Sequence, residues 1–123
     1  MDYFLNEKQK MIKSLARSLA NEKILPVRAE LDEKEEFPSA IMKDLADADM
    51  FRLFVPEEYG GLGGGCLDLC VVVEELSRGC SGVAVSYAAS ALGAYPLLDY
   101  GSEEQKRKYL PDIASGKKLA AYA

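Results

Sequence analysis

Histidine is absent from this 123-residue chain, and cysteine occurs only three times, at Cys66, Cys70 and Cys80. The cysteine spacing matches neither a disulfide framework nor a zinc site, and a mixed cysteine and histidine site cannot form without histidine. We therefore expect no metal centre and three reduced thiols, most of them buried. The sequence shows no nucleophile paired with a base and no oxyanion-binding device, so it offers no catalytic residue of its own.

The chain also lacks the signals that direct a protein to a membrane or out of the cell. Its N-terminal region has neither the basic and apolar parts of a secretory leader nor the Arg- and Ser-rich composition of a transit peptide. Lys and Arg alternate with Asp and Glu, and the net charge is -5, which argues against a nucleic-acid or anionic-membrane surface. These features predict a cytoplasmic protein, from a bacterium.

One stretch, residues 79–98, contains no charged side chain although Arg78 and Asp99 flank it directly. As a helix it would be about 30 Å long, enough to cross a bilayer, but its serines and Pro96 make it too polar and too interrupted for lipid. We expect a helix that its neighbours enclose. Its small side chains either allow close helix packing or leave space for one wall of a ligand cavity.

The remaining pattern is helical, and 123 residues with 49% apolar composition suffice for one domain. Apolar spacing and capping signals predict an all-α orthogonal or up-down bundle of five to six helices. The expected elements are a helix over 6–25 opened by an Asn6/Gln9 capping box, a charged segment over 27–36 begun by Pro26, a helix capped by Ser39 and ending near Met50, an extended run over 51–55, a helix over 67–78, and a helix opened by a Ser102/Gln105 capping box. Residues 119–123 are expected to start a strand or a buried segment.

Two patterns that suggest chemistry are better explained by structure. The glycine-rich stretch 60–65 has neither the Gly-Lys-Ser/Thr of a P-loop nor the third glycine of a dinucleotide fingerprint, so a loop with positive-φ turns is expected. Glu74 and Glu75 are adjacent on a helix and point about 100° apart, so they cannot share a substrate. Glu74 is instead placed to pair with Arg78 on the surface.

Three segments, in this order and at these separations, give the chain a strong resemblance to a known family. They are residues 55–63 (VPEEYGGLG), 74–76 (EEL) and 101–111 (GSEEQKRKYLP), and Ile24-Leu25-Pro26 adds to them. Together they resemble the N-terminal helical domain of flavin-dependent acyl-CoA dehydrogenases, and the likeness covers essentially the whole chain.

The resemblance implies a flavoprotein of about three times this length, a homotetramer or a dimer. Residues 1–123 would be its N-terminal helical domain, and a middle β domain that binds FAD and a C-terminal helical domain would lie outside the chain. The family's reaction is α,β-dehydrogenation of an acyl-CoA: a glutamate removes the α-proton while the β-hydrogen leaves as hydride to the flavin. That glutamate would lie beyond residue 123, so residues 1–123 alone are expected to be inactive.

The resemblance also implies binding residues. The positions that match the far end of the acyl pocket are Ala84, Val85, Ala88, Ala89 and Leu92. Ala84 and Ala88 are small, which favours a medium, long or bulky acyl group, and glutaryl-CoA-type relatives place an arginine where Ala84 stands, which argues against a dicarboxylic acyl group. Tyr122 and Ala123 match the start of a segment that touches the flavin.

Family members pass electrons to an electron-transferring flavoprotein that docks in an apolar hollow on the helical domain. The positions that match this hollow are Ile12, Ala16, Met50, Leu62 and Val72. Each of them is equally well explained as an ordinary core residue.

Two other functions remain open on the sequence. One is a free-standing helical interaction module that kept the fold without the chemistry, and the other is a helical carrier of lipid or acyl groups. The first would be favoured by a coding sequence that stops after Ala123, and the second requires acyl-CoA binding without flavin.

Overall fold

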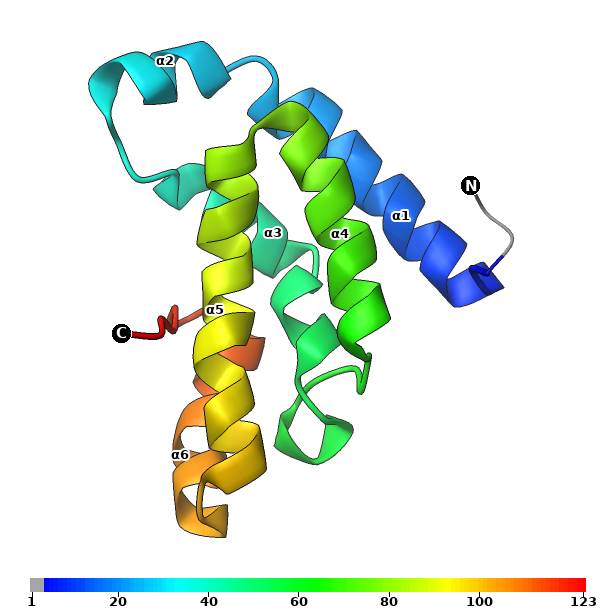
Figure 1. Ribbon diagram of the computed structural model, residues 1–123, viewed down its shortest axis with the longest axis vertical. Coiled ribbons are helices and arrows are strands. Elements are labelled where there is room, and N and C mark those ends of the chain that lie inside the picture. Colours follow the sequence, from blue (N-terminus) through cyan, green and yellow to red (C-terminus); the bar gives the residue numbers. More distant parts are fainter. Residues whose placement is uncertain (1–3) are drawn as a thin grey trace.

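The computed structural model describes residues 4–123, and every regular element in that range is a helix (Figure 1). The prediction of an all-α domain is confirmed. The α-helices are α1 (Glu7–Leu19), α2 (Arg28–Lys34), α3 (Ser39–Asp47), α4 (Cys66–Gly79), α5 (Ser81–Tyr100) and α6 (Glu103–Ala114), and the shorter elements are a π-helix, η1 (Ala20–Ile24), and two 3-10 helices, η2 (Met50–Phe54) and η3 (Glu57–Tyr59).

The long helices α1, α4 and α5 form the frame of the domain (Figure 1). Because only Cys80 separates α4 from α5, the two run antiparallel, and α1 packs against the other side of α4. α6 lies against the C-terminal half of α5 and against η2. The short, charged helix α2 stands apart and buries none of its residues.

The core is centred on an aromatic cluster between η2 and α5. The Phe51 and Tyr87 rings lie 5.2 Å apart, those of Phe54 and Tyr87 lie 6.1 Å apart, and all three residues are at most 2% exposed. The Tyr87 hydroxyl donates to the Met50 carbonyl at 2.8 Å, which satisfies the one polar atom of the cluster. Burial raises the pKa of Tyr87 far above its usual range, so the residue remains a neutral donor.

The extended run predicted for residues 51–55 is wrong, because this segment is the 3-10 helix η2. Asp49 precedes it in the left-handed region at φ 59°, and the Arg52 guanidinium bonds both the Asp49 carboxylate and the Gly60 carbonyl, at 2.7 and 2.6 Å. These bonds hold the chain in a tight coil, and the apolar run that looks like a strand instead turns its side chains into the core.

The glycine-rich loop takes its shape from close backbone contacts. Gly60 and Gly63 have positive φ values of 85° and 63°, as the sequence predicts. At Gly61 a β-carbon would lie 1.7 Å from the Val55 carbonyl oxygen, which no other residue type could accommodate. Gly65 has open space around it, so only part of the glycine run is required by packing.

Helix boundaries are predicted well where side chains cap them. Both expected capping boxes are present, at Asn6/Gln9 and at Ser102/Gln105. The predicted 6–25 helix continues as a π-helix after Leu19, and α3 starts with Pro38 at its cap, so Ser39 is its first helical residue and not its cap. The remaining differences are that Pro26 lies in a turn before α2, that α3 ends at Asp47, and that residues 119–123 form no strand.

The thiols are more accessible than the sequence suggests. Cys66 and Cys70 are exposed and Cys80 is half-buried, so the expectation of mostly buried thiols is wrong. All three are free, as predicted. The two exposed residues lie in the first two turns of α4.

A buried ion pair joins α1 to α4. The Arg17 guanidinium donates to both carboxylate oxygens of Glu75, at 2.8 and 2.9 Å, and the Glu75 side chain is only 3% exposed. Arg78 approaches the same carboxylate at 3.4 Å, which replaces the predicted surface pair with Glu74. The hydrogen bond from Arg17 is the main reason that the pKa of Glu75 lies below its usual value of 4.5.

We predict that Glu75→Gln lowers the free energy of unfolding by about 2–3 kcal/mol at neutral pH, because Arg17 loses its charged partner. A lowered carboxyl pKa contributes stability above the unfolded-state pKa, and that contribution is lost as the pH falls through the folded-state value. The difference between variant and parent should therefore shrink below about pH 4. Denaturant unfolding at neutral and acidic pH measures it, with exposed Glu74→Gln as control; an equal difference at both pH values would contradict the assignment.

Candidate functional site

Helix α5 has two different sides. Its inner side belongs to the core and carries Val83, Tyr87 and Ala91, all at most 2% exposed. On its outer side Val85 is 66% exposed and Leu92 is 58% exposed, with the half-buried Ala88 and Ala89 between them. The spacing i, i+3, i+4, i+7 places these four residues on one stripe of the helix. We call Val85, Ala88, Ala89 and Leu92 the outer strip.

The outer strip changes two expectations. Neighbouring helices do not enclose the whole uncharged helix, because its outer side faces solvent within residues 4–123. Four of the five predicted acyl-pocket residues lie together on that side. The fifth, Ala84, is 1% exposed and belongs to the core, so the arrangement does not place it beside the other four. Close packing therefore describes the inner side of the helix, and a ligand wall on the outer side stays a prediction.

The C-terminal tail crosses α5 beside this strip (Figure 1). The Ala120 N–H donates to the Ser90 hydroxyl at 3.3 Å, and a β-carbon on Gly93 would lie 2.8 Å from the Ala120 β-carbon. The absence of a side chain at Gly93 therefore allows the tail to lie directly on the helix. Tyr122 follows with 69% of its surface exposed, so the predicted flavin-contacting end of the chain lies close to the predicted acyl-binding strip.

The tail fits a partial contact with a flavin. Tyr122 offers an exposed aromatic ring, and neither Tyr122 nor Ala123 is held in the core. Two terminal residues can cover only an edge of so large a cofactor. A flavin contact of Tyr122 and Ala123 stays a prediction.

A separate cleft lies between α2 and the start of α5. It has a volume of about 460 Å³ and is lined by Leu31, Phe37, Val83 and Ser86, among others. None of the predicted acyl-pocket residues lines it. The cleft therefore gives no support to the acyl site, which rests on the outer strip alone.

The predicted docking hollow is not a surface feature. Ile12, Ala16, Met50 and Val72 are at most 8% exposed and belong to the core, and of the five only Leu62 reaches the surface, at 40% exposed. These four residues are therefore core residues, which is the alternative explanation that the sequence left open.

The apolar side chains that the structure exposes near Leu62 are different ones. Met11 and Leu15 of α1 and Leu67 of α4 are 73%, 44% and 49% exposed, and the Lys8 ammonium lies 3.5 Å from the Leu62 carbonyl oxygen, which brings the loop to α1. Helical periodicity did not predict these exposed positions, because it assigns apolar residues to the stripe of the helix that faces the core, and Leu15 lies on that stripe. Met11 lies off the stripe, which is the one sign in the sequence that an apolar side chain of α1 is exposed.

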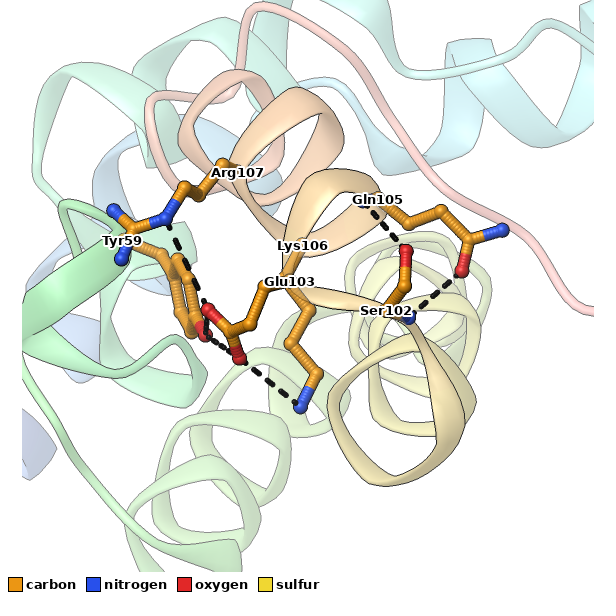
Figure 2. Close-up of polar contacts among 6 residues, drawn as sticks. All are labelled: Tyr59, Ser102, Glu103, Gln105, Lys106 and Arg107. Atoms are coloured by element: carbon orange, nitrogen blue, oxygen red, sulfur yellow. Dashed lines mark hydrogen bonds and ion pairs between the residues drawn. The ribbon is translucent and has the colours of Figure 1, made fainter.

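Two of the segments that carry the family resemblance meet at the glycine-rich loop (Figure 2). The Tyr59 hydroxyl lies 3.0 Å from both carboxylate oxygens of Glu103, the first residue of α6, and the Arg107 guanidinium lies 6.0 Å from the Tyr59 ring centre. Lys106 approaches Glu103 at 4.0 Å. The capping box at Ser102 fixes the first turn of α6 and so positions Glu103.

This cluster fastens the loop to α6. Burial, followed by the hydrogen bond to Glu103, raises the pKa of Tyr59, so the phenol stays protonated and acts as a donor. Glu103 is occupied as its acceptor. The motif residues here have a structural task.

Within residues 4–123 no group of three or more histidine, cysteine or acidic residues could hold a metal ion. No helix in that range is both long enough and apolar enough to cross a bilayer. What the described residues do define is a helical domain with one apolar strip left open beside its C-terminal tail.

Comparisons with known proteins identify this domain. The family model for the acyl-CoA dehydrogenase N-terminal domain matches residues 6–117. The short-chain specific acyl-CoA dehydrogenase of Clostridium acetobutylicum is 37% identical over 123 residues, which cover 99% of this chain and 32% of that protein.

Solved structures agree with the sequence match. A chain from the structure of the electron transferring flavoprotein of Acidaminococcus fermentans superimposes with a TM-score of 0.90 at 35% identity, covering 97% of this chain and 32% of that one. Butyryl-CoA dehydrogenase from Megasphaera elsdenii gives 0.88 at 32% identity, with the same coverage.

The chain belongs to the acyl-CoA dehydrogenase family and corresponds to its N-terminal domain. It spans about a third of the length of the relatives that it matches.

We predict that Tyr59→Phe lowers the free energy of unfolding by about 1 kcal/mol, since it removes the hydrogen bond between the loop and Glu103. Thermal or denaturant unfolding of the variant measures this loss. Tyr100→Phe, at an 89% exposed position, is the matched control and should leave stability unchanged. Equal effects of the two substitutions would rule out the fastening role.

Proposed function

We propose that this chain is the N-terminal helical domain of an FAD-dependent acyl-CoA dehydrogenase. The observation that carries the proposal is the outer strip: small and apolar side chains, without charge, left uncovered on α5 next to the tail. A fatty acyl group needs an apolar wall of this kind. On this proposal residues 1–123 form one domain, and a middle β domain and a C-terminal helical domain complete the enzyme.

In this mechanism the chain's residues bind and shield but do not transfer protons. Val85 and Leu92 would contact the acyl chain and exclude water from its far end, and Tyr122 and Ala123 would touch the edge of the flavin. When bound, FAD supplies the acceptor for the β-hydride. On this proposal the base that takes the α-proton lies outside residues 1–123, and Glu75 and Glu103 instead make ion pairs and hydrogen bonds that maintain the fold.

The strip also bears on the substrate class. No member of the strip is charged, which argues against a dicarboxylic acyl group, whose distal carboxylate would need a cationic partner. Ala88 and Ala89 leave room for a medium, long or bulky acyl group. The relatives named above are described as short-chain or butyryl enzymes, and chain-length measurements decide between these sizes.

For the electron acceptor we propose an electron-transferring flavoprotein, with Leu62 as the one predicted docking residue that can reach a partner. The intact enzyme is proposed to be a homotetramer or a dimer in the bacterial cytoplasm, acting in fatty acid metabolism. We place no nucleic acid or membrane among its partners.

Reduction of the bound flavin tests the proposal. The complete gene product should bind FAD, and its flavin absorbance should bleach on addition of saturated acyl-CoAs, most efficiently with medium or long chains. Ala88→Phe should lower kcat/KM for long acyl-CoAs at least about tenfold more than for butyryl-CoA, because the larger ring fills the far end of the pocket. Ala29→Phe on the exposed helix α2 is the control. A complete protein that is colourless and unreactive would defeat the assignment.

A second variant tests the partner. Leu62→Asp should slow electron transfer to the electron-transferring flavoprotein about tenfold, because it puts a charge into an apolar contact, while flavin reduction by acyl-CoA stays unchanged. Tyr100→Asp, at an exposed site on α5, serves as control. Equal transfer rates for Leu62→Asp and the parent would remove Leu62 from the docking surface.

The interaction module and the acyl carrier make different predictions. A coding sequence that ends naturally at Ala123 favours the module. A carrier would require residues 1–123 to bind acyl-CoA without flavin, and a calorimetric titration that gives no heat would remove it.

A further inference from the structure

Two exposed thiols lie one helical turn apart at the start of α4. Cys66 is the first residue of the helix and Cys70 follows at i+4, so both side chains lie on one face. Partial burial, followed by the neighbouring Cys66 thiol, raises the pKa of Cys70. Neither thiol has a place in the proposed acyl-CoA chemistry.

A third group nearby lacks a partner. The Tyr95 hydroxyl of α5 is buried, and no described residue hydrogen-bonds to it. It lies within electrostatic reach of Cys66, Cys70 and Asp68. Asp68 is already occupied, because its carboxylate accepts the Gly65 N–H at 2.7 Å. The Tyr95 hydroxyl is therefore an unused donor in the neighbourhood of the two thiols.

Cys66 is the first residue of α4, where the N–H groups of the first turn have no intrahelical acceptors. Its thiol is exposed, so an electrophile can reach it, and the thiol of Cys70 lies one turn further along the same face.

The spacing decides what the pair can hold. Residues at i and i+4 of a helix have β-carbons about 5–6 Å apart, whereas a disulfide requires about 3.5–4.5 Å. A disulfide would therefore pull the first turn of α4 out of shape. An atom that bridges the sulfurs makes two longer bonds instead of one short one, and it leaves the helix intact.

We propose that Cys66 and Cys70 form a dithiol site that takes a trivalent arsenical across its two sulfurs. With a monosubstituted arsenical, each thiol replaces one hydroxyl on arsenic: two S–H and two As–O bonds break, two As–S bonds and two O–H bonds form, and two waters leave. No electron is transferred, so no oxidant is required.

The test uses the complete gene product and phenylarsine oxide as the probe. Trypsin releases Cys66 and Cys70 together in residues 53–78 and Cys80 separately in residues 79–106, since no Lys or Arg interrupts either stretch. After treatment, the first peptide should carry one phenylarsenic group and resist iodoacetamide, while Cys80 is alkylated. A small dithiol should reverse the modification, whereas a monothiol at the same concentration should not.

Matched variants separate a two-sulfur site from a single reactive thiol. Cys70→Ser should weaken retention of the probe at least about a hundredfold, since the second bond is intramolecular, and Cys80→Ser should change nothing. Both Cys66 and Cys70 are exposed, so serine at either is compatible with folding, and unchanged far-UV circular dichroism confirms it. Alkylation of both thiols after treatment, or equal retention by Cys70→Ser, would overturn the proposal. Neither result depends on acyl-CoA activity.

Discussion

The contact between Tyr87 and η2 supports the rest of the domain. Tyr87 comes from the inner side of α5, packs on Phe51 and Phe54, and donates its hydroxyl to the Met50 carbonyl. Tyr87 is the largest buried side chain of α5, and the other buried residues of the helix are smaller. The helix is thereby fixed in rotation, and the outer strip faces away from the core because Tyr87 faces into it.

Much of this fold follows from local patterns in the sequence. Side-chain caps mark the starts of α1 and α6, and the apolar period predicts the inner faces of α3 and α4. The 3-10 helix η2 is not predictable in this way, because the bond from Arg52 to the Gly60 carbonyl that helps to shape it joins the helix to the following loop. The same holds for Glu75, because its partner Arg17 is 58 residues away. Helical spacing can suggest only pairs within α4, such as Glu74 with Arg78.

The candidate site is predictable only in part. Resemblance points to α5 and to the four residues of its outer strip, but it cannot tell that Ala84 lies on the buried side of the helix. That depends on the rotation of the helix, which long-range packing sets. The docking residues show the same limit, since burial of Ile12 or Val72 is a property of the assembled core. The two thiols of α4 differ: their spacing is visible in the sequence, and only their exposure is not.

Gly93 weakens the helix but allows the tail to lie close to it. A glycine inside a helix costs about 1 kcal/mol of helix propensity relative to alanine, so alanine here would favour the isolated helix. An alanine methyl group, however, would meet Ala120 and the Ala121 backbone at 2.8 Å and lift the tail from α5. With glycine at this position the helix propensity is lower, and Ala120 can pack directly on the helix. The direction in which the chain leaves the domain therefore depends on Gly93 in α5, 27 residues before Ala120.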